Sequence, residues 1–163
     1  MKKIILTLAL VLSMSTALFA QAEGSTIGLR FGYPTEVSYQ KGLNSENRIE
    51  LGLGFRNYVG YYTNLSVSGV YQWVKDLSTI ADGMAWYYGG GASVGFYSYY
   101  QNSYFPISVL GQVGIQYDFN VPLRLSLDWR PGFQFGGYKD SHYTNNGFVG
   151  DGVCLGIRYI LGK

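Results

Sequence analysis

The sequence predicts an all-β protein, a transmembrane antiparallel up-and-down β-barrel of eight strands that follows an N-terminal signal peptide. Apolar and polar residues alternate with a period of two along most of the chain, as they do in strands with one lipid-facing side. Only 13% of the residues are charged, against roughly 25% in ordinary soluble domains. After residue 22, no apolar stretch approaches the roughly 18 uncharged residues that a membrane helix needs.

The first 22 residues have the organisation of a secretory signal peptide. Two lysines precede an apolar run over residues 4–12, and Ala20-Gln21-Ala22 supplies a small-x-small cleavage motif. We expect residues 1–22 to be removed and residues 23–163 to form one barrel domain, since this length fits a single domain. The full chain has 12 basic and 10 acidic residues, so loss of the two lysines leaves it neutral. A neutral chain gives no reason to expect a nucleic-acid partner.

Eight segments with this alternation follow one another along residues 25–161. The clearest covers residues 123–135, where Leu125, Leu127 and Trp129 alternate with polar residues over a length sufficient to cross a bilayer. Links of varying length separate the segments. The predicted strands are Ser25 to Tyr33, Thr35 to Leu43, Arg48 to Tyr58, Tyr62 to Lys75, Met84 to Ser98, Phe105 to Phe119, Leu123 to Phe135, and Gly150 to Leu161.

The size of the apolar side chains predicts which face of the strands lies inside. The interior of an eight-stranded barrel is just wide enough to be filled by side chains. The apolar face carries the tryptophans and several phenylalanines, which cannot all fit there, whereas the other face is rich in glycine and serine. We therefore expect lipid around the apolar face and a narrow polar lumen. A soluble lipocalin-type barrel would have the opposite arrangement.

Charged residues within the predicted strands fall on the polar face, as a lumen requires. A lysine or arginine at mid-bilayer depth on the lipid face would cost roughly 2 to 4 kcal/mol. The acids expected in the lumen are Glu50 and Asp128, and the arginines expected to pair with them through bidentate hydrogen bonds are Arg30, Arg130 and Arg158. We interpret this set as a structural polar core. The alternative is a gate or an ion path.

Aromatic residues gather near both ends of the predicted strands, where amphipathic rings lie at the level of lipid headgroups. Examples are Tyr99 and Tyr104 at one end, and Trp73 and Trp86 at the other. We expect these rings to anchor the barrel in the membrane. The alternative is that some of the tyrosines form a sugar- or lipid-binding surface.

The last strand and three earlier segments resemble known proteins. Gly156 to Leu161 resembles the C-terminal assembly signal of outer-membrane barrels, in which a glycine is followed by an aromatic residue and a terminal hydrophobic residue. Residues 27–34, 86–92 and 125–131 are similar to segments of a family of small, mostly uncharacterised eight-stranded outer-membrane barrel proteins of Gram-negative bacteria. The resemblance implies a location in the bacterial outer membrane, and we expect the barrel to be a monomer. Its surroundings would be lipid and lipopolysaccharide, and the barrel assembly machinery would insert it.

An enzymatic alternative comes from the single histidine of the chain. His142, Thr144 and Asn145 resemble the His-x-Ser-Asn motif of outer-membrane lipid A 3-O-deacylases, with threonine in place of serine. A histidine and a hydroxyl two residues apart on an extended strand share a face, which suits base-assisted attack on an acyl ester. The acidic member of that family's triad has no counterpart after the motif other than Asp151.

The sequence predicts neither a metal site nor a cofactor. The chain has one histidine, one cysteine and scattered acids, which do not make a metal-ligand set. Cys154 has the parity of the lumen and is expected to be an inert thiol. We therefore expect a non-enzymatic, envelope-structural or interaction role with no catalytic residues. A lipid A ester hydrolase that uses His142 and Thr144, and a narrow channel, are the alternatives.

Overall fold

The computed structural model describes the backbone of residues 24–32, 34–58, 62–99, 102–136, 147–150 and 152–162. Within these residues the chain is all-β and forms eleven strand segments. They are β1 (Ser25–Gly32), β2 (Thr35–Gly42), β3 (Asn47–Tyr58), β4 (Tyr62–Asp76), β5 (Met84–Tyr99), β6 (Asn102–Tyr104), β7 (Ile107–Asp118), β8 (Leu123–Trp129), β9 (Gly132–Phe135), β10 (Gly147–Val149) and β11 (Val153–Leu161). The described residues include no helix of the length and apolarity that a membrane crossing requires.

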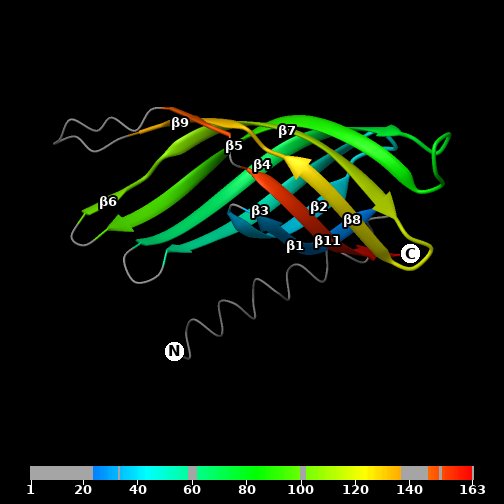
Figure 1. Cartoon of the computed structure of the whole chain (residues 1–163), viewed down its shortest axis with the longest axis horizontal. Helices are drawn as coiled ribbons and strands as arrows, with labels where there is room; N and C mark the ends of the chain where they lie inside the picture. Colours follow the sequence, from blue (N-terminus) through cyan, green and yellow to red (C-terminus); the bar gives the residue numbers. More distant parts are fainter. Residues whose placement is uncertain are drawn as a thin grey trace, which may run out of the picture.

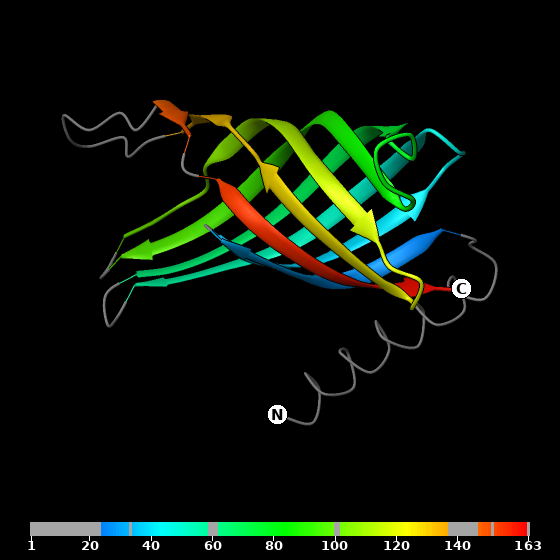
Figure 2. The same ribbon diagram turned by 45° about the vertical axis from the view of Figure 1, so that its right-hand side comes forward.

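The eleven segments make a closed barrel of eight antiparallel strands (Figure 1). Three of the barrel strands consist of two consecutive segments each: β6 with β7, β8 with β9, and β10 with β11. The pairing shows this, because β5 pairs with both β6 and β7, and β7 pairs with both β8 and β9. Figure 2 shows β11 between β8 and β1, where the sheet closes. The predicted eight-stranded, up-and-down barrel is therefore confirmed.

Two of the interruptions fall at prolines. Proline has no backbone N–H and cannot donate to a sheet ladder. Its carbonyl still accepts, since the Gly95 amide donates to Pro106 at 2.9 Å and the Gly111 amide donates to Pro131 at 2.8 Å. The strand predicted over residues 123–135 is therefore interrupted at Pro131. The strand predicted from Phe105 in fact begins at β6, within residues 99–104 that were expected to form a link, and Phe105 and Pro106 separate β6 from β7.

The strand at the C-terminal end also differs from its predicted bounds. It was expected to begin at Gly150, with residues 136–149 as a link. Instead β10 pairs with β9 over Gly147 to Val149, and a break precedes β11. Across that break the Arg130 amide donates to the Gly152 carbonyl at 2.9 Å, which keeps this strand bound to its neighbour.

The two faces of the barrel are chemically distinct. Apolar side chains point outward, and many are about half exposed, such as Leu51 at 52% and Val67 at 48%. Polar and charged side chains are buried inside, so the predicted orientation of the two faces is confirmed. Small residues make the narrow interior possible: a Cβ on Gly114 would lie 2.6 Å from Asp128 Cβ and 2.8 Å from Tyr87 Cζ.

The barrel has two ends that differ in the chain segments they contain. At the terminal end, β1 begins and β11 ends, because Ser25 is opposite Leu161 in the register. At the opposite end, β1 and β2 are joined by a short link around Pro34. The longest uninterrupted segments are β4 and β5, with 15 and 16 residues.

Candidate functional site

Six charged side chains meet in the middle of the lumen, and we call them the central cluster. They come from five of the eight barrel strands, and the closure between β1 and β11 brings the residues of the first three strands next to those of the last two. The members are Arg30 on β1, Glu36 on β2, Glu50 on β3, Asp128 on β8, Arg130 directly after β8 and Arg158 on β11. Each is buried, with exposed fractions from 1% to 8%.

Glu50 is the hub of the central cluster. Its Oε1 accepts from Arg158 Nη2 at 3.0 Å and from Arg130 Nη2 at 3.1 Å. Its Oε2 accepts from the side-chain amides of Gln40 at 2.9 Å and Gln72 at 2.6 Å. Both carboxylate oxygens therefore receive two donors each, which fits an ionised, acceptor-only group.

Arg30 joins the other two carboxylates of the central cluster. Its guanidinium donates to Glu36 through Nη1 and to Asp128 through Nη2 and Nε, so Asp128 is bound in a bidentate manner. Its Nε also lies 3.6 Å from Glu50 Oε1. Asp128 accepts a further hydrogen bond from the Tyr87 hydroxyl at 3.0 Å.

Arg130 completes the central cluster by bridging Glu36 and Glu50. Its Nη1 donates to Glu36 Oε2 at 2.9 Å, and its Nη2 donates to Glu50 Oε1 at 3.1 Å. Three arginines thus face three carboxylates, and the cluster is neutral. Every acid has at least one guanidinium partner, which is what compensates the desolvation of buried charges.

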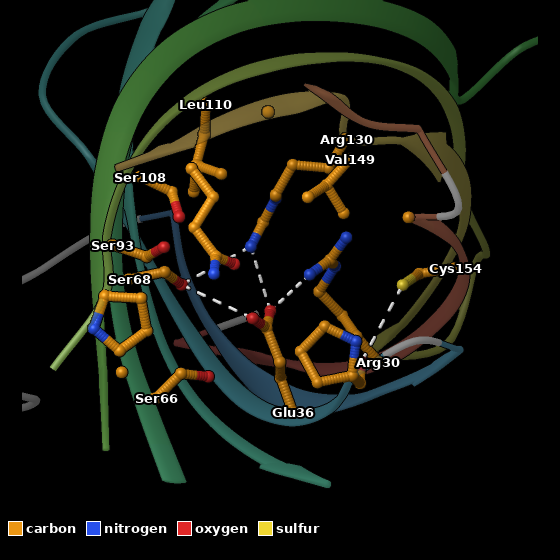
Figure 3. A pocket seen from close by; sticks show the side chains of 16 residues that line it. Arg30, Glu36, Ser66, Ser68, Ser93, Ser108, Leu110, Arg130, Val149 and Cys154 are labelled. Carbon is orange, nitrogen blue, oxygen red and sulfur yellow. Dashed lines mark hydrogen bonds and ion pairs between the residues drawn. The ribbon is translucent and has the colours of Figure 1, made fainter. Parts of the chain in front are cut away.

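A small pocket of about 120 Å³ lies between the central cluster and the opposite end of the barrel. Figure 3 shows serines along one side of it, with Arg30, Glu36 and Arg130 meeting across from them. Three of the serines form one row across adjacent strands, because Ser68 is opposite Ser93 and Ser93 is opposite Ser108. We call this the serine pocket. Its size and hydroxyl lining suit a few water molecules.

A second charged group lies toward the terminal end, and we call it the terminal layer. It consists of Arg48, Gln72, Gln116, Asp118 and Arg124. Arg124 forms a bidentate pair with Asp118, with Nε to Oδ1 at 2.6 Å and Nη2 to Oδ2 at 2.7 Å. Within the described part of the chain, Arg48 contacts neutral groups alone: the side chains of Gln72 and Gln116, and the Tyr87 ring 4.6 Å from its Cζ.

The central cluster has no obvious catalytic chemistry. Its carboxylates are engaged by arginines, so none is a free general base, and arginine stays protonated. Cys154 is buried at 2% exposure, and its thiol lies 4.0 Å from the Pro34 carbonyl. Among the described residues, no group of three or more histidine, cysteine and acidic side chains is arranged to hold a metal ion.

All five lumen residues predicted from the sequence lie in the central cluster: Arg30, Glu50, Asp128, Arg130 and Arg158. The candidate catalytic residues His142 and Thr144 lie outside the described residues. Sequence reasoning did not single out Glu36 as a lumen acid or Tyr87 as a lumen donor. Strand parity could have indicated that Tyr87 faces the lumen, because it lies between the outward-facing Trp86 and Tyr88.

A comparison of the chain with protein families, with curated proteins and with solved structures found no match. Function is therefore inferred from the chain's own residues and their geometry. Two features are available for that purpose: the apolar exterior and the charged interior of the barrel.

Proposed function

We propose that the protein is an integral outer-membrane barrel with a non-enzymatic role, either supporting the cell envelope or presenting an interaction surface. The observation that carries this proposal is the reversed polarity of the barrel. Its exterior is apolar and its interior holds the charges. A surrounding of lipid accounts for both at once.

The apolar exterior is too extensive for a protein that lives in water. Soluble monomers rarely expose contiguous apolar patches larger than a few hundred Å². Here the outward positions of neighbouring strands are apolar, as in the facing pair Leu53 and Val67 and the facing pair Ile115 and Leu127. A closed barrel also leaves no unpaired strand edge in lipid, where an unsatisfied backbone group costs several kcal/mol.

The location in the outer membrane is supported by the signal peptide expected over residues 1–22 and by the resemblance of Gly156 to Leu161 to a barrel assembly signal. Bacterial membrane barrels with this strand number reside in outer membranes. The partners on this proposal are the lipid and lipopolysaccharide around the barrel, with the assembly machinery acting during biogenesis. The barrel itself is proposed to be a monomer.

The packing of the lumen argues against a channel. Arg30, Glu50, Asp128 and Arg158 are each exposed by 2% or less. They bind one another across the barrel axis, which leaves the serine pocket and the terminal end on opposite sides of a filled layer. An ion would have to break several charge-assisted hydrogen bonds to pass this layer. We therefore propose a closed lumen.

The ester-hydrolase alternative depends on His142 and Thr144, and no described residue favours it. Mass spectrometry of lipid A tests it directly. Cells expressing the wild-type chain and cells expressing the variant His142→Ala should give the same lipid A profile. A deacylated species that appears with the wild type and disappears with the variant would contradict the non-enzymatic role.

Membrane residence is tested by fractionation of cells that express the full chain. The protein should sediment with the outer membrane and resist alkaline extraction, whereas a control lacking residues 1–22 should remain inside the cell and fail to reach that membrane. Refolded residues 23–163 should also migrate differently on detergent gels before and after boiling, because a closed barrel resists unfolding in detergent. Equal migration without β-rich circular dichroism, or a soluble exported protein, would refute the proposal.

A further inference from the structure

Arg48 is a buried cation that has no carboxylate partner among the residues that the structure describes. The residue is 5% exposed, and its side chain extends from β3 into the terminal end of the lumen. Its Nε donates to Gln72 and its Nη1 donates to Gln116 Oε1 at 2.6 Å. Its Nη2 is buried and has no hydrogen-bond acceptor. Unpaired buried charge is costly, and native proteins rarely retain it without a reason.

The charge balance of the lumen isolates Arg48 as the surplus cation. Among the side chains that the structure describes, five arginines point into the lumen and face four carboxylates. Glu36, Glu50 and Asp128 are engaged by the central cluster, and Asp118 is held by Arg124. The nearest link from Arg48 to an acid runs through Gln72, which donates to Glu50 at 2.6 Å. A neutral amide carries no compensating charge.

An open cavity adjoins this surplus charge. It has a volume of about 520 Å³ and lies at the terminal end of the barrel. We call it the vestibule. Arg48, Gln116 and Arg124 line it from the lumen side, and the turn between β2 and β3 lines it through Asn44 and Ser45. A second guanidinium thus borders the cavity, although the charge of Arg124 is already balanced by Asp118.

We propose that the vestibule binds a phosphate-class oxyanion, with Arg48 as the principal residue and Arg124 as the second. The planar guanidinium fork matches two oxygens of such an anion, and a hydrogen bond to a charged group is stronger than one between neutral groups. Nη2 is not exposed in the open vestibule. Binding therefore includes a side-chain adjustment of Arg48 that brings this edge of the guanidinium to the cavity. The bound anion would satisfy Nη2, and in its singly charged form it would balance the one surplus charge of the described lumen.

The oxyanion could be a free phosphate or the phosphate of a lipid headgroup that reaches the mouth of the barrel. The two sources share the same chemistry at Arg48. They differ in what competes for the site, because a headgroup phosphate without a cation of its own is present only when an anionic lipid surrounds the barrel, whereas the phosphate of phosphatidylcholine is balanced by its own choline. The experiment below separates them by the composition of the vesicles.

Binding of inorganic phosphate is measured with refolded residues 23–163 in neutral detergent. The readout is the broadening of the ³¹P resonance of phosphate, and an inert salt keeps the ionic strength constant. The wild type should give saturable broadening. Arg48→Gln should weaken binding by about tenfold or more, because it removes the charge and the fork. Lys75→Gln is the matched control. Lys75 is an exposed cation at the same end, paired with Glu46 at 3.1 Å and absent from the vestibule lining, so its loss should leave binding unchanged.

The source of the oxyanion is identified by the same titration in two kinds of vesicle. One kind contains phosphatidylcholine alone, and the other also contains phosphatidylglycerol. Loss of inorganic phosphate binding only with phosphatidylglycerol would assign the site to a headgroup, and equal binding would assign it to free phosphate. Absence of saturation with the wild type in detergent overturns the proposal, as does equal binding by Arg48→Gln. If Arg48→Gln does not refold, Arg48→Lys serves instead. It keeps the charge but loses the fork, so it must bind measurably more weakly than the wild type.

Discussion

The central cluster and the terminal layer both contain buried arginines, but the two groups differ in charge balance. In the central cluster, Arg30, Arg130 and Arg158 are each bound to at least one carboxylate. In the terminal layer, Arg124 is paired with Asp118, but Arg48 is held only by amides and an aromatic ring. Burial alone therefore does not define the role of an arginine. A balanced group fixes the packing of the lumen, whereas a surplus charge is available to a ligand.

Tyr87 connects the two regions. Its hydroxyl donates to Asp128 at 3.0 Å, and its ring lies beneath the Arg48 guanidinium at 4.6 Å. The ring can cross the lumen because the facing position on β7 is Gly114, where a Cβ would collide with it. A cation over an aromatic face gains roughly 0.5 to 2 kcal/mol, depending on its solvation. The aromatic ring carries no negative charge, so Tyr87 holds Arg48 in place without neutralising it.

The largest effect is expected when the hub of the central cluster loses its charge. Glu50→Gln should destabilise the refolded barrel by about 3 to 5 kcal/mol, because removing one partner leaves buried charges uncompensated. The amide cannot adapt by turning over. Both oxygens of Glu50 accept from donors, so an NH₂ group would face a guanidinium on one side or the amides of Gln40 and Gln72 on the other.

Urea unfolding in detergent measures this change, and Glu46→Gln is the matched control. Glu46 is 64% exposed at its side chain and pairs only with Lys75 at the surface. Exposed pairs of this kind contribute roughly 0 to 1 kcal/mol. Equal stability of Glu50→Gln and Glu46→Gln would show that water reaches the central cluster, and the closed lumen would then be wrong.

On the exterior, an arginine substitution should destabilise the middle of the barrel more than its end. Leu51 lies in the middle of β3 and is 52% exposed, whereas Leu43 follows β2 at the terminal end and is 50% exposed. In a bilayer, Leu51→Arg should destabilise by about 2 to 4 kcal/mol and Leu43→Arg by about 0 to 1 kcal/mol, since the cost falls with distance from the midplane.

Reversible unfolding of both variants in phosphatidylcholine vesicles checks the comparison. The two leucines have nearly equal exposure, so accessible area cannot account for a difference between them. If the two variants were equally stable, depth in a bilayer would not be the cause of the apolar exterior. The proposal of membrane residence would lose its main support.

Sequence reasoning reached the strands and their polarity because both follow from a period of two. The same parity placed Arg30, Glu50, Asp128, Arg130 and Arg158 inside the lumen. Parity does not give the pairing of side chains, which depends on the stagger of strands that are far apart in the sequence. Glu50 and Arg158 meet only because the sheet closes between β1 and β11. For the same reason, the sequence could not reveal that Arg48 lacks an acid.

The prolines mark another limit of the sequence pattern. Alternation continues on both sides of Pro131, so residues 123–135 were predicted as one strand, whereas Pro106 lies next to the predicted start of its strand and β6 before it was predicted as a link. Alternation reports which face a side chain occupies, but it does not report whether a backbone N–H is available. The carbonyls of both prolines still accept from neighbouring strands, which preserves the course of the barrel through each interruption.

The smallest effect on stability is expected at Arg48, although its side chain is buried and is less exposed than Arg130 of the central cluster. Arg48→Gln loses hydrogen bonds to Gln72 and Gln116 and the contact with the Tyr87 ring. It also removes a desolvated charge and an unsatisfied Nη2, which offsets that loss. Replacing a buried charge by a neutral group is often neutral or stabilising, so the free energy of unfolding in phosphate-free detergent should stay within about 1 kcal/mol of the wild type.

Added inorganic phosphate should then stabilise the wild type more than the variant, because a ligand that binds only the folded state raises its stability. A loss as large as that of Glu50→Gln would instead make Arg48 a structural member of the lumen packing, and the contrast between the central cluster and the terminal layer would disappear.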